Sequence, residues 1–184
     1  MVRLRSGTKF SLCTFTIVRD TREILPYTFT GFLDDAAKKH RPIVVPTVRE
    51  TLKTGDYSIK GMESLITVER KSKSDLYSTL GSGRKRFEEE FRRMAEMEYA
   101  ALVIEDDWIG LLKSPPERSS LHPKTVYRTL LSWSIRYRVH VFPMPSRLFA
   151  ERQTFRLLQQ FFKIRTQTKI KVGKDVEVEP REME

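Results

Sequence analysis

The chain has 184 residues, which is enough for one domain with its own hydrophobic core. A hydrophobic fraction of 39% beside 32% charged residues excludes a largely disordered chain, and a net charge of +10 favours a polyanionic partner such as nucleic acid. One cysteine and three scattered histidines exclude an intramolecular disulfide, a cysteine-based zinc site and a histidine-rich metal cluster. No apolar run is long enough to span a membrane and no signal-peptide pattern is present, so we expect an intracellular protein, cytoplasmic or nuclear.

Short apolar runs alternate with helical patterns along the chain, which predicts an α/β domain. The first half is expected to contain a strand at 15–18, a helix at 30–39, an extended segment at 42–48 and a hairpin with strands at 57–59 and 65–69. Pro42 and Pro46 disfavour a helix in the extended segment.

The second half is predicted to alternate helices with buried strands. We expect helices at 72–80, 84–98, 124–137 and 146–163, strands at 100–104 and 139–142, and a loop at 115–123. Phe87, Phe91 and Met94 follow the spacing of one helix face, which predicts a buried stripe. The domain is therefore expected at 14–163, between an N-terminal extension at 1–13 and a charged C-terminal tail at 164–184.

Acidic residues occur at the predicted strand ends. Asp20 follows the first strand, and the predicted hairpin brings Asp56 near Glu69. Carboxylates are suitable ligands for Mg²⁺ or Mn²⁺, which can polarise a phosphodiester and activate a bound water. Lys71 lies two residues after Glu69 and shares its strand face, so its ammonium can orient that water or offset charge on the phosphate, whereas Arg70 points to the opposite face.

Simpler interpretations exist for the same residues. Asp56 follows Gly55 and fits an ordinary turn. Glu69 and Lys71 fit the solvated face of an amphipathic strand, and Asp75 fits a cap for the following helix. The residue pattern alone leaves these alternatives open.

Basic residues gather in two places. Residues 118–150 contain six Lys or Arg and no acid, and the helix predicted there places Lys124, Arg128 and Arg136 on a face opposite Val126, Leu130 and Trp133. The second cluster, at a predicted helix N-terminus, consists of Arg84, Lys85 and Arg86. Both are candidate phosphate-binding surfaces, and both also fit the solvated helices of a basic protein.

Three stretches resemble a known nuclease family. Residues 68–76 (Val-Glu-Arg-Lys-Ser-Lys-Ser-Asp-Leu) closely resemble the Glu-Arg-Lys-x3-Asp signature of the XPF-type structure-specific endonucleases, a branch of the PD-(D/E)XK nucleases. Residues 17–23 resemble the family's strand followed by Asp-x-Arg-Glu, and residues 55–57 its Gly-Asp-Tyr hairpin. The resemblance covers about 14–163 and implies a restriction-endonuclease-like core, a central mixed β-sheet flanked by helices.

The resemblance also implies roles for individual residues. Asp20, Asp56 and Glu69 would bind the metal, Mg²⁺ or Mn²⁺, and Lys71 would be catalytic. Supporting roles in the catalytic site are implied for Arg22, Glu23, Arg70 and Asp75. The implied activity is hydrolysis of phosphodiesters in branched, flap or fork DNA, as in DNA repair and recombination.

The sequence departs from the family pattern in two respects. Arg19 occupies a position beside Asp20 that is usually apolar or small, and no helix-hairpin-helix DNA-binding domain follows the nuclease region. We therefore expect either a homodimer through the late helices or a DNA-binding partner subunit. Two alternatives stay open: a non-catalytic nucleic-acid-binding scaffold, and a PD-(D/E)XK nuclease of other preference, resolvase-like or RNA-directed.

Overall fold

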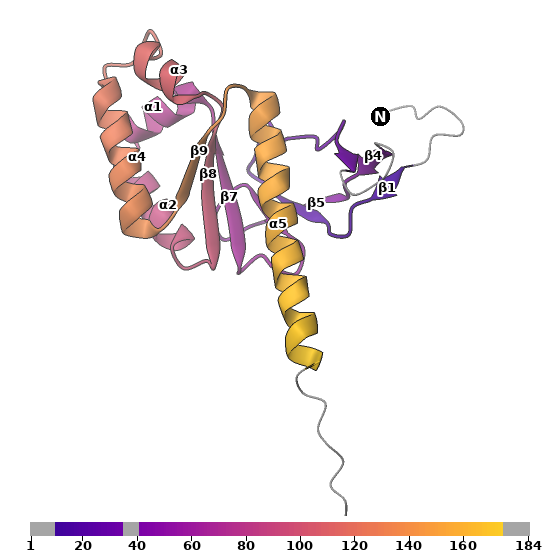
Figure 1. Ribbon diagram of the computed structural model, residues 1–184. Coiled ribbons are helices and arrows are strands. Elements are labelled where there is room, and N and C mark those ends of the chain that lie inside the picture. Colours follow the sequence, from indigo (N-terminus) through magenta and orange to yellow (C-terminus); the bar gives the residue numbers. More distant parts are fainter. Residues whose placement is uncertain (1–9, 35–40, 175–184) are drawn as a thin grey trace, which may run out of the picture.

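The computed structural model describes residues 10–34 and 41–174, with side chains up to residue 167 (Figure 1). In chain order the described elements are β1 (Ser11–Leu12), β2 (Ile17–Asp20), β3 (Leu33–Asp34), β4 (Arg41–Val44), β5 (Thr47–Glu50), β6 (Tyr57–Ile59), β7 (Ile66–Lys71), α1 (Lys73–Gly81), α2 (Arg84–Met94), β8 (Tyr99–Ile104), α3 (Trp108–Lys113), α4 (Pro123–Tyr137), β9 (His140–Pro143) and α5 (Arg147–Lys174). None of the described helices is both long and apolar enough to cross a bilayer.

The main sheet has six strands in the order β5-β2-β6-β7-β8-β9. The strands β6 and β7 form the expected antiparallel hairpin, and β7, β8 and β9 run parallel to one another. Parallel neighbours require crossover connections, which α1 with α2 and α3 with α4 supply. A smaller sheet, β1-β4-β3, lies beside the N-terminal half. The predicted α/β fold, a mixed sheet flanked by helices, is confirmed.

The two faces of the sheet pack against different helices. In Figure 1, α5 covers one face, while α1, α2 and α4 lie on the other. Strand alternation divides β8 accordingly, because Val103 belongs to the core with α5, and Leu102 and Ile104 belong to the core with α1, α2 and α4. The predicted stripe of α2 is confirmed, since Phe87 and Phe91 are at most 1% exposed.

Several elements differ from the sequence prediction. The first strand ends at Asp20, two residues later than expected. The helix predicted at 30–39 is wrong where the structure describes it, because Leu33 pairs with Pro42 in a short antiparallel ladder; residues 35–40 lie outside the described residues. The predicted helix 84–98 ends earlier, at Met94.

The other differences concern α3 and α5. The six-residue α3 is too short to show a helical period, and it begins where the carboxylate of Asp107 accepts a hydrogen bond from Gly110 N at 2.7 Å. The last helix continues to Lys174, past its expected end at 163. Its charged and amide residues are good helix formers even without an apolar stripe.

Candidate active site

The hairpin of β6 and β7 positions the first acidic residue. Gly55 has φ of +74°, and a Cβ there would lie 1.9 Å from Thr67 Oγ1. The same Thr67 hydroxyl donates a 2.9 Å hydrogen bond to Thr54 O, and Asp56 N donates to Val68 O at 3.0 Å. The positive φ and the close Thr67 side chain therefore favour glycine just before Asp56.

Asp56 and Glu69 both border a cavity of about 350 Å³ at the end of β7. Asp56 Oδ2 accepts a 2.8 Å hydrogen bond from the backbone N–H of Arg70. Glu69 is 4% exposed, and its Oε1 lies 2.8 Å from Lys71 Nζ. The cavity is lined by Arg22, Glu23, Ile24, Leu25, Asp56, Glu69, Arg70, Lys71, Ser72 and Asp75.

Burial and mutual repulsion perturb the two carboxyl groups. Burial raises the pKa of Asp56 to about 7, and the Glu23 and Glu90 carboxylates add to that rise. Burial also raises the pKa of Glu69 well above its usual value, and the neighbouring Asp56 carboxylate raises it further. Two carboxyl groups that resist ionisation side by side favour a cation between them.

Lys71 is the cation on the same face of β7. Burial opposes its charge, but the Glu69 carboxylate outweighs burial and holds the pKa of Lys71 above its usual value. Its ammonium also lies 3.2 Å from Asp75 Oδ2 and over the ring of Phe87. The ammonium is thus fixed from three sides at the rim of the cavity.

Asp75 is not the cap of α1. Ser72 fills that role, because its hydroxyl accepts a hydrogen bond from Asp75 N at 3.2 Å. The Asp75 side chain is instead 53% exposed and turned toward Lys71. The structure therefore brings Asp75 to the cavity together with Asp56, Glu69 and Lys71.

Arg70 points to the opposite face of β7, as expected, and enters a separate ion-pair network. Its guanidinium binds Glu105 through two hydrogen bonds of 2.7 and 2.8 Å and lies 3.5 Å from Glu23 Oε1. Arg147 of α5 reaches the same Glu105 at 2.7 Å and also donates to the carbonyl of Leu25 at 2.7 Å. Arg70 and Glu23 therefore brace the loop after β2 beside the acidic pair.

Asp20 departs from its predicted place. Its carboxylate is 1% exposed, with Oδ1 accepting from Arg22 N and Nε at 2.8 and 2.7 Å, and Oδ2 accepting from Leu52 N at 2.7 Å. Burial alone would raise its pKa, but the hydrogen bonds from Arg22 and Leu52 lower it below the usual value. Of the three predicted acidic ligands, Asp56 and Glu69 line the cavity, whereas Asp20 turns back onto its own loop and is not among the lining residues.

The pair that remains suits a magnesium-like ion. Among the described residues, no group of three or more His, Cys, Asp or Glu side chains is placed to hold a metal. Mg²⁺ commonly binds through one or two carboxylates and keeps several waters. Asp56 and Glu69 supply two oxygen ligands of this kind on an open cavity, so the residues present fit such an ion.

Sequence reasoning missed two residues that act on this site. Glu90 of α2 contributes to the raised pKa of both Asp56 and Glu69, and Arg147 connects α5 to the network of Arg70. A signal for Glu90 was present, because it occupies position i+3 from Phe87 on the apolar stripe, where a charge is unusual. No local pattern marks Arg147.

The predicted nucleic-acid-binding residues divide into two groups. Arg84 donates to Thr129 Oγ1 at 2.8 Å and lies over the ring of Trp133, and Arg136 lies 3.5 Å from Glu88. The side chains that stay exposed without such a contact in the described structure are Lys85, Arg86, Lys124 and Arg128. The predicted solvent face of α4 is confirmed, since Val126, Leu130 and Trp133 are buried behind it.

Comparisons with known proteins agree with the fold. The family model described as "ERCC4 domain" matches residues 19–161. Among solved structures, XPF from Aeropyrum pernix is similar with a TM-score of 0.55 and 19% identity, covering 86% of this chain and 69% of that one. XPF from Aeropyrum pernix in complex with DNA gives a TM-score of 0.52 and 22% identity, covering 65% of this chain and 55% of that one. No curated protein matches the chain.

Proposed function

Since the chain belongs to the ERCC4 domain family, a family of structure-specific DNA nucleases, we propose that it is a divalent-metal-dependent DNA endonuclease. The observation that carries the proposal is the pair of Asp56, half-buried, and Glu69, buried, at one cavity, with the Lys71 ammonium 2.8 Å from the Glu69 carboxylate. A scaffold subunit has no need for two mutually repelling carboxylates at a cavity rim, since each raises the cost of burying the other.

Each residue at the cavity has its own proposed role. Asp56 and Glu69 would hold Mg²⁺ or Mn²⁺, which when bound supplies a polarised phosphate oxygen and a water of lowered pKa. The N–H of Arg70 fixes the Asp56 carboxylate, so its orientation does not depend on the Arg70 side chain. Lys71, whose pKa is raised, would place a positive charge where negative charge develops on the phosphate being attacked.

The proposed substrate is branched, flap or fork DNA. One of the similar structures is XPF from Aeropyrum pernix with DNA bound, and this chain carries a net charge of +10. Lys124 and Arg128 of α4 leave two exposed cations near each other on one helix face, which suits phosphate contacts.

A homodimer through the late helices, or a partner subunit, remains part of the proposal. α4 exposes a second stripe of large apolar side chains, Tyr127, Leu131 and Ile135, which are 41%, 49% and 74% exposed. α5 exposes Leu148 and Phe149 near its start. Large apolar side chains exposed together on one helix face favour a protein interface.

The test is cleavage of end-labelled fork, flap, four-way junction, plain duplex and RNA substrates at equal concentration. We expect cutting of a branched DNA with Mg²⁺ or Mn²⁺, and binding without cutting in Ca²⁺. Glu69→Gln is the matched control for a contaminating nuclease. Cutting in EDTA, or DNA binding with no cutting of any substrate in Mg²⁺ or Mn²⁺, would contradict the proposal, and the second result would favour the scaffold alternative.

A further inference from the structure

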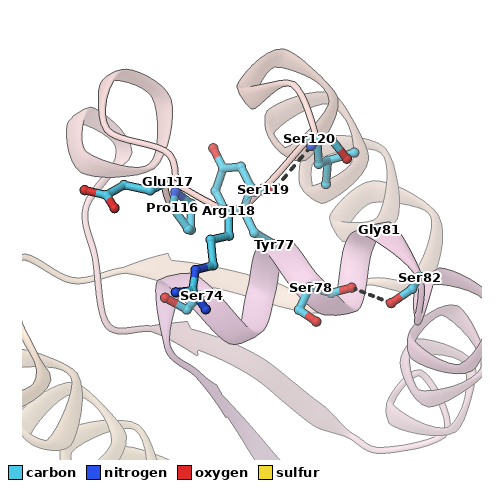
Figure 2. Close-up of a pocket in the computed structure, with 11 residues that line it drawn as sticks. Ser74, Tyr77, Ser78, Gly81, Ser82, Pro116, Glu117, Arg118, Ser119 and Ser120 are labelled. Carbon is cyan, nitrogen blue, oxygen red and sulfur yellow. Dashed lines mark hydrogen bonds between the residues drawn. The ribbon is translucent and has the colours of Figure 1, made fainter.

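A second cavity, of about 730 Å³, lies between α1 and the loop that joins α3 to α4 (Figure 2). We name it the serine groove. It is lined mainly by small hydroxyl side chains and one arginine: Ser74, Ser78, Ser82, Ser119, Ser120 and Arg118. Figure 2 shows Arg118 extending from the loop toward Ser74 on the first turn of α1.

The chemistry of the groove suits a phosphodiester backbone. Serine hydroxyls and arginine guanidinium groups are common phosphate-binding groups in protein–DNA contacts. The one aromatic ring in the lining, that of Tyr77, is 1% exposed, and its hydroxyl donates to Leu111 O. The groove therefore offers contacts to phosphate and sugar but no exposed ring on which a base could stack.

The position of the groove relates it to the acidic cavity. Both cavities border α1: Ser72 and Asp75 line the acidic one, while Ser74 and Ser78 line the serine groove. A helix is about 10 Å across, so a strand that passes over α1 from the acidic cavity would reach the serine groove within a few nucleotides. From Ser74 to Ser82 the groove runs along α1 for about 12 Å, room for about three phosphates.

The surrounding charge favours an anion. Arg118 is the first residue of the stretch 118–150, which contains six basic and no acidic residues. Glu117 is the one acid in the lining, and its side chain is exposed. A strand leaving the acidic cavity across α1 would meet the Arg118 guanidinium and then the exposed side of α4.

We infer that the serine groove binds the backbone of one DNA strand a few nucleotides from the phosphate that is cut. This inference rests on the proposed function and adds a second contact region to it. The geometry that supports it is the shared helix, the hydroxyl lining and the arginine that spans the groove.

Gly81 lines the serine groove, so substitutions there test the inference. It is the last residue of α1, and a Cβ there would meet no atom within 4 Å, so the fold accepts a side chain. Gly81→Glu and Gly81→Lys therefore place opposite charges into the same space. Gln160→Glu and Gln160→Lys are the matched controls, because Gln160 is exposed on α5, across the sheet.

The readout is the Kd for fluorescent forked DNA in Ca²⁺, with melting temperature as the check on folding. We expect Gly81→Glu to bind roughly tenfold more weakly than Gly81→Lys, while the Gln160 pair differs by about twofold or less. Equal differences at the two positions would reflect net charge alone and would overturn the inference. A photo-crosslinking residue at position 78 should label one strand about two to four nucleotides from the cut, and no crosslink to DNA would also overturn it.

The groove inference and the nuclease proposal can fail independently of each other. If the wild-type protein cuts DNA and the Gly81 pair binds equally, the groove inference fails while the nuclease proposal stands. If the Gly81 pair differs as expected and no DNA is cut in Mg²⁺ or Mn²⁺, the groove is supported and the nuclease proposal fails.

Discussion

The ends of β2 and β7 present the same short pattern, an acid followed two residues later by a base, yet the two pairs behave in opposite ways. Asp20 with Arg22 and Glu69 with Lys71 both join a buried carboxylate to a cation, at 2.7 and 2.8 Å. The pKa of Asp20 is lowered below its usual value, whereas that of Glu69 is raised well above it.

The difference lies in the remaining partners of each carboxylate. Both oxygens of Asp20 accept hydrogen bonds, from Arg22 and from Leu52 N, which compensates its burial. Glu69 has the ammonium of Lys71, but it also faces the Asp56 carboxylate, which opposes its charge. A carboxylate whose two oxygens both accept hydrogen bonds holds a loop in place. A carboxylate with fewer donors, beside another acid, is available to a ligand.

The largest expected effect is on the cutting rate, and it is expected for the pair of Glu69 and Lys71 but not for the pair of Asp20 and Arg22. Glu69→Gln and Lys71→Ala should each lower the cutting rate by about 10²-fold or more, because they remove a ligand or a charge that acts in the transition state. DNA binding should stay within a few-fold. Single-turnover cleavage and Kd measurements check both statements, and near wild-type cutting by Lys71→Ala would show that its assigned role is wrong.

The second effect is on stability rather than activity. Asp20→Asn should lower the free energy of unfolding by about 1–3 kcal/mol, because Arg22 and Leu52 N lose a charged acceptor. The melting temperature should fall by about 2–4 °C per kcal/mol, while the folded protein still cuts. Arg22→Ala should lower the free energy of unfolding by less than Asp20→Asn does, since the Arg22 side chain is 66% exposed and the hydrogen bond from Leu52 N to Asp20 remains. An Asp20→Asn variant with unchanged melting and lost metal binding would make Asp20 a ligand after all.

The third effect is a dependence of stability on pH that has opposite signs for Asp56 and Asp20. Because the pKa of Asp56 is raised in the folded state from 3.8 to about 7, ionising it opposes folding. Its contribution to the stability of the metal-free protein is therefore undiminished below pH 3.8 and declines as the pH rises to about 7. Asp20, with its lowered pKa, instead favours folding above the usual carboxyl range and loses that contribution in acid.

Asp56→Asn makes this dependence measurable. Denaturant unfolding in EDTA should show the variant more stable than the wild type at pH 8, by about 1 kcal/mol or more, and nearly equal to it at pH 4. Mg²⁺ should then stabilise the wild type at pH 8 but not the variant. Equal stabilities at pH 8 in EDTA would contradict the raised pKa.

The smallest effect extends the comparison to α4, where Arg136 pairs with Glu88 while Lys124 and Arg128 have no ion-pair partner among the described residues. Arg136 lies 3.5 Å from Glu88, while Lys124 and Arg128 are exposed. Lys124→Ala with Arg128→Ala should reduce the slope of log Kd against log salt by about 1.8, and Arg136→Ala should change it by less than the 0.9 of a full phosphate contact. Titrations of forked DNA at several salt concentrations test this, and an unchanged slope for the double variant would point to Lys85 and Arg86.

Sequence reasoning found the parts of the site that depend on local spacing. The hairpin placed Asp56 near Glu69, and strand alternation separated Arg70 from Lys71; the structure confirms both placements. The true position of Asp20 was not predictable in this way, because one of its partners, Leu52 N, lies 32 residues away in sequence.

Other features of the structure could not be predicted from the sequence, for related physical reasons. Helix α3 is shorter than two helical turns and carries no period. Arg147 meets Glu105 only because α5 returns to the same end of the sheet, and its contacts with the loop at Leu25 span 122 residues. Such contacts depend on tertiary packing and leave no trace in a short window of sequence.

Gly55 has a consequence for how distant relatives are searched for. A Cβ at this position would lie 1.9 Å from Thr67 Oγ1 on a backbone with positive φ, so any other residue would strain the turn and displace the Thr67 hydroxyl beside Asp56. A chain that keeps both carboxylates and the lysine but carries a larger residue here would have the right ligands on a strained hairpin. A search pattern that scores only the acidic and basic positions would accept such chains as active enzymes, and one that requires the glycine would reject them.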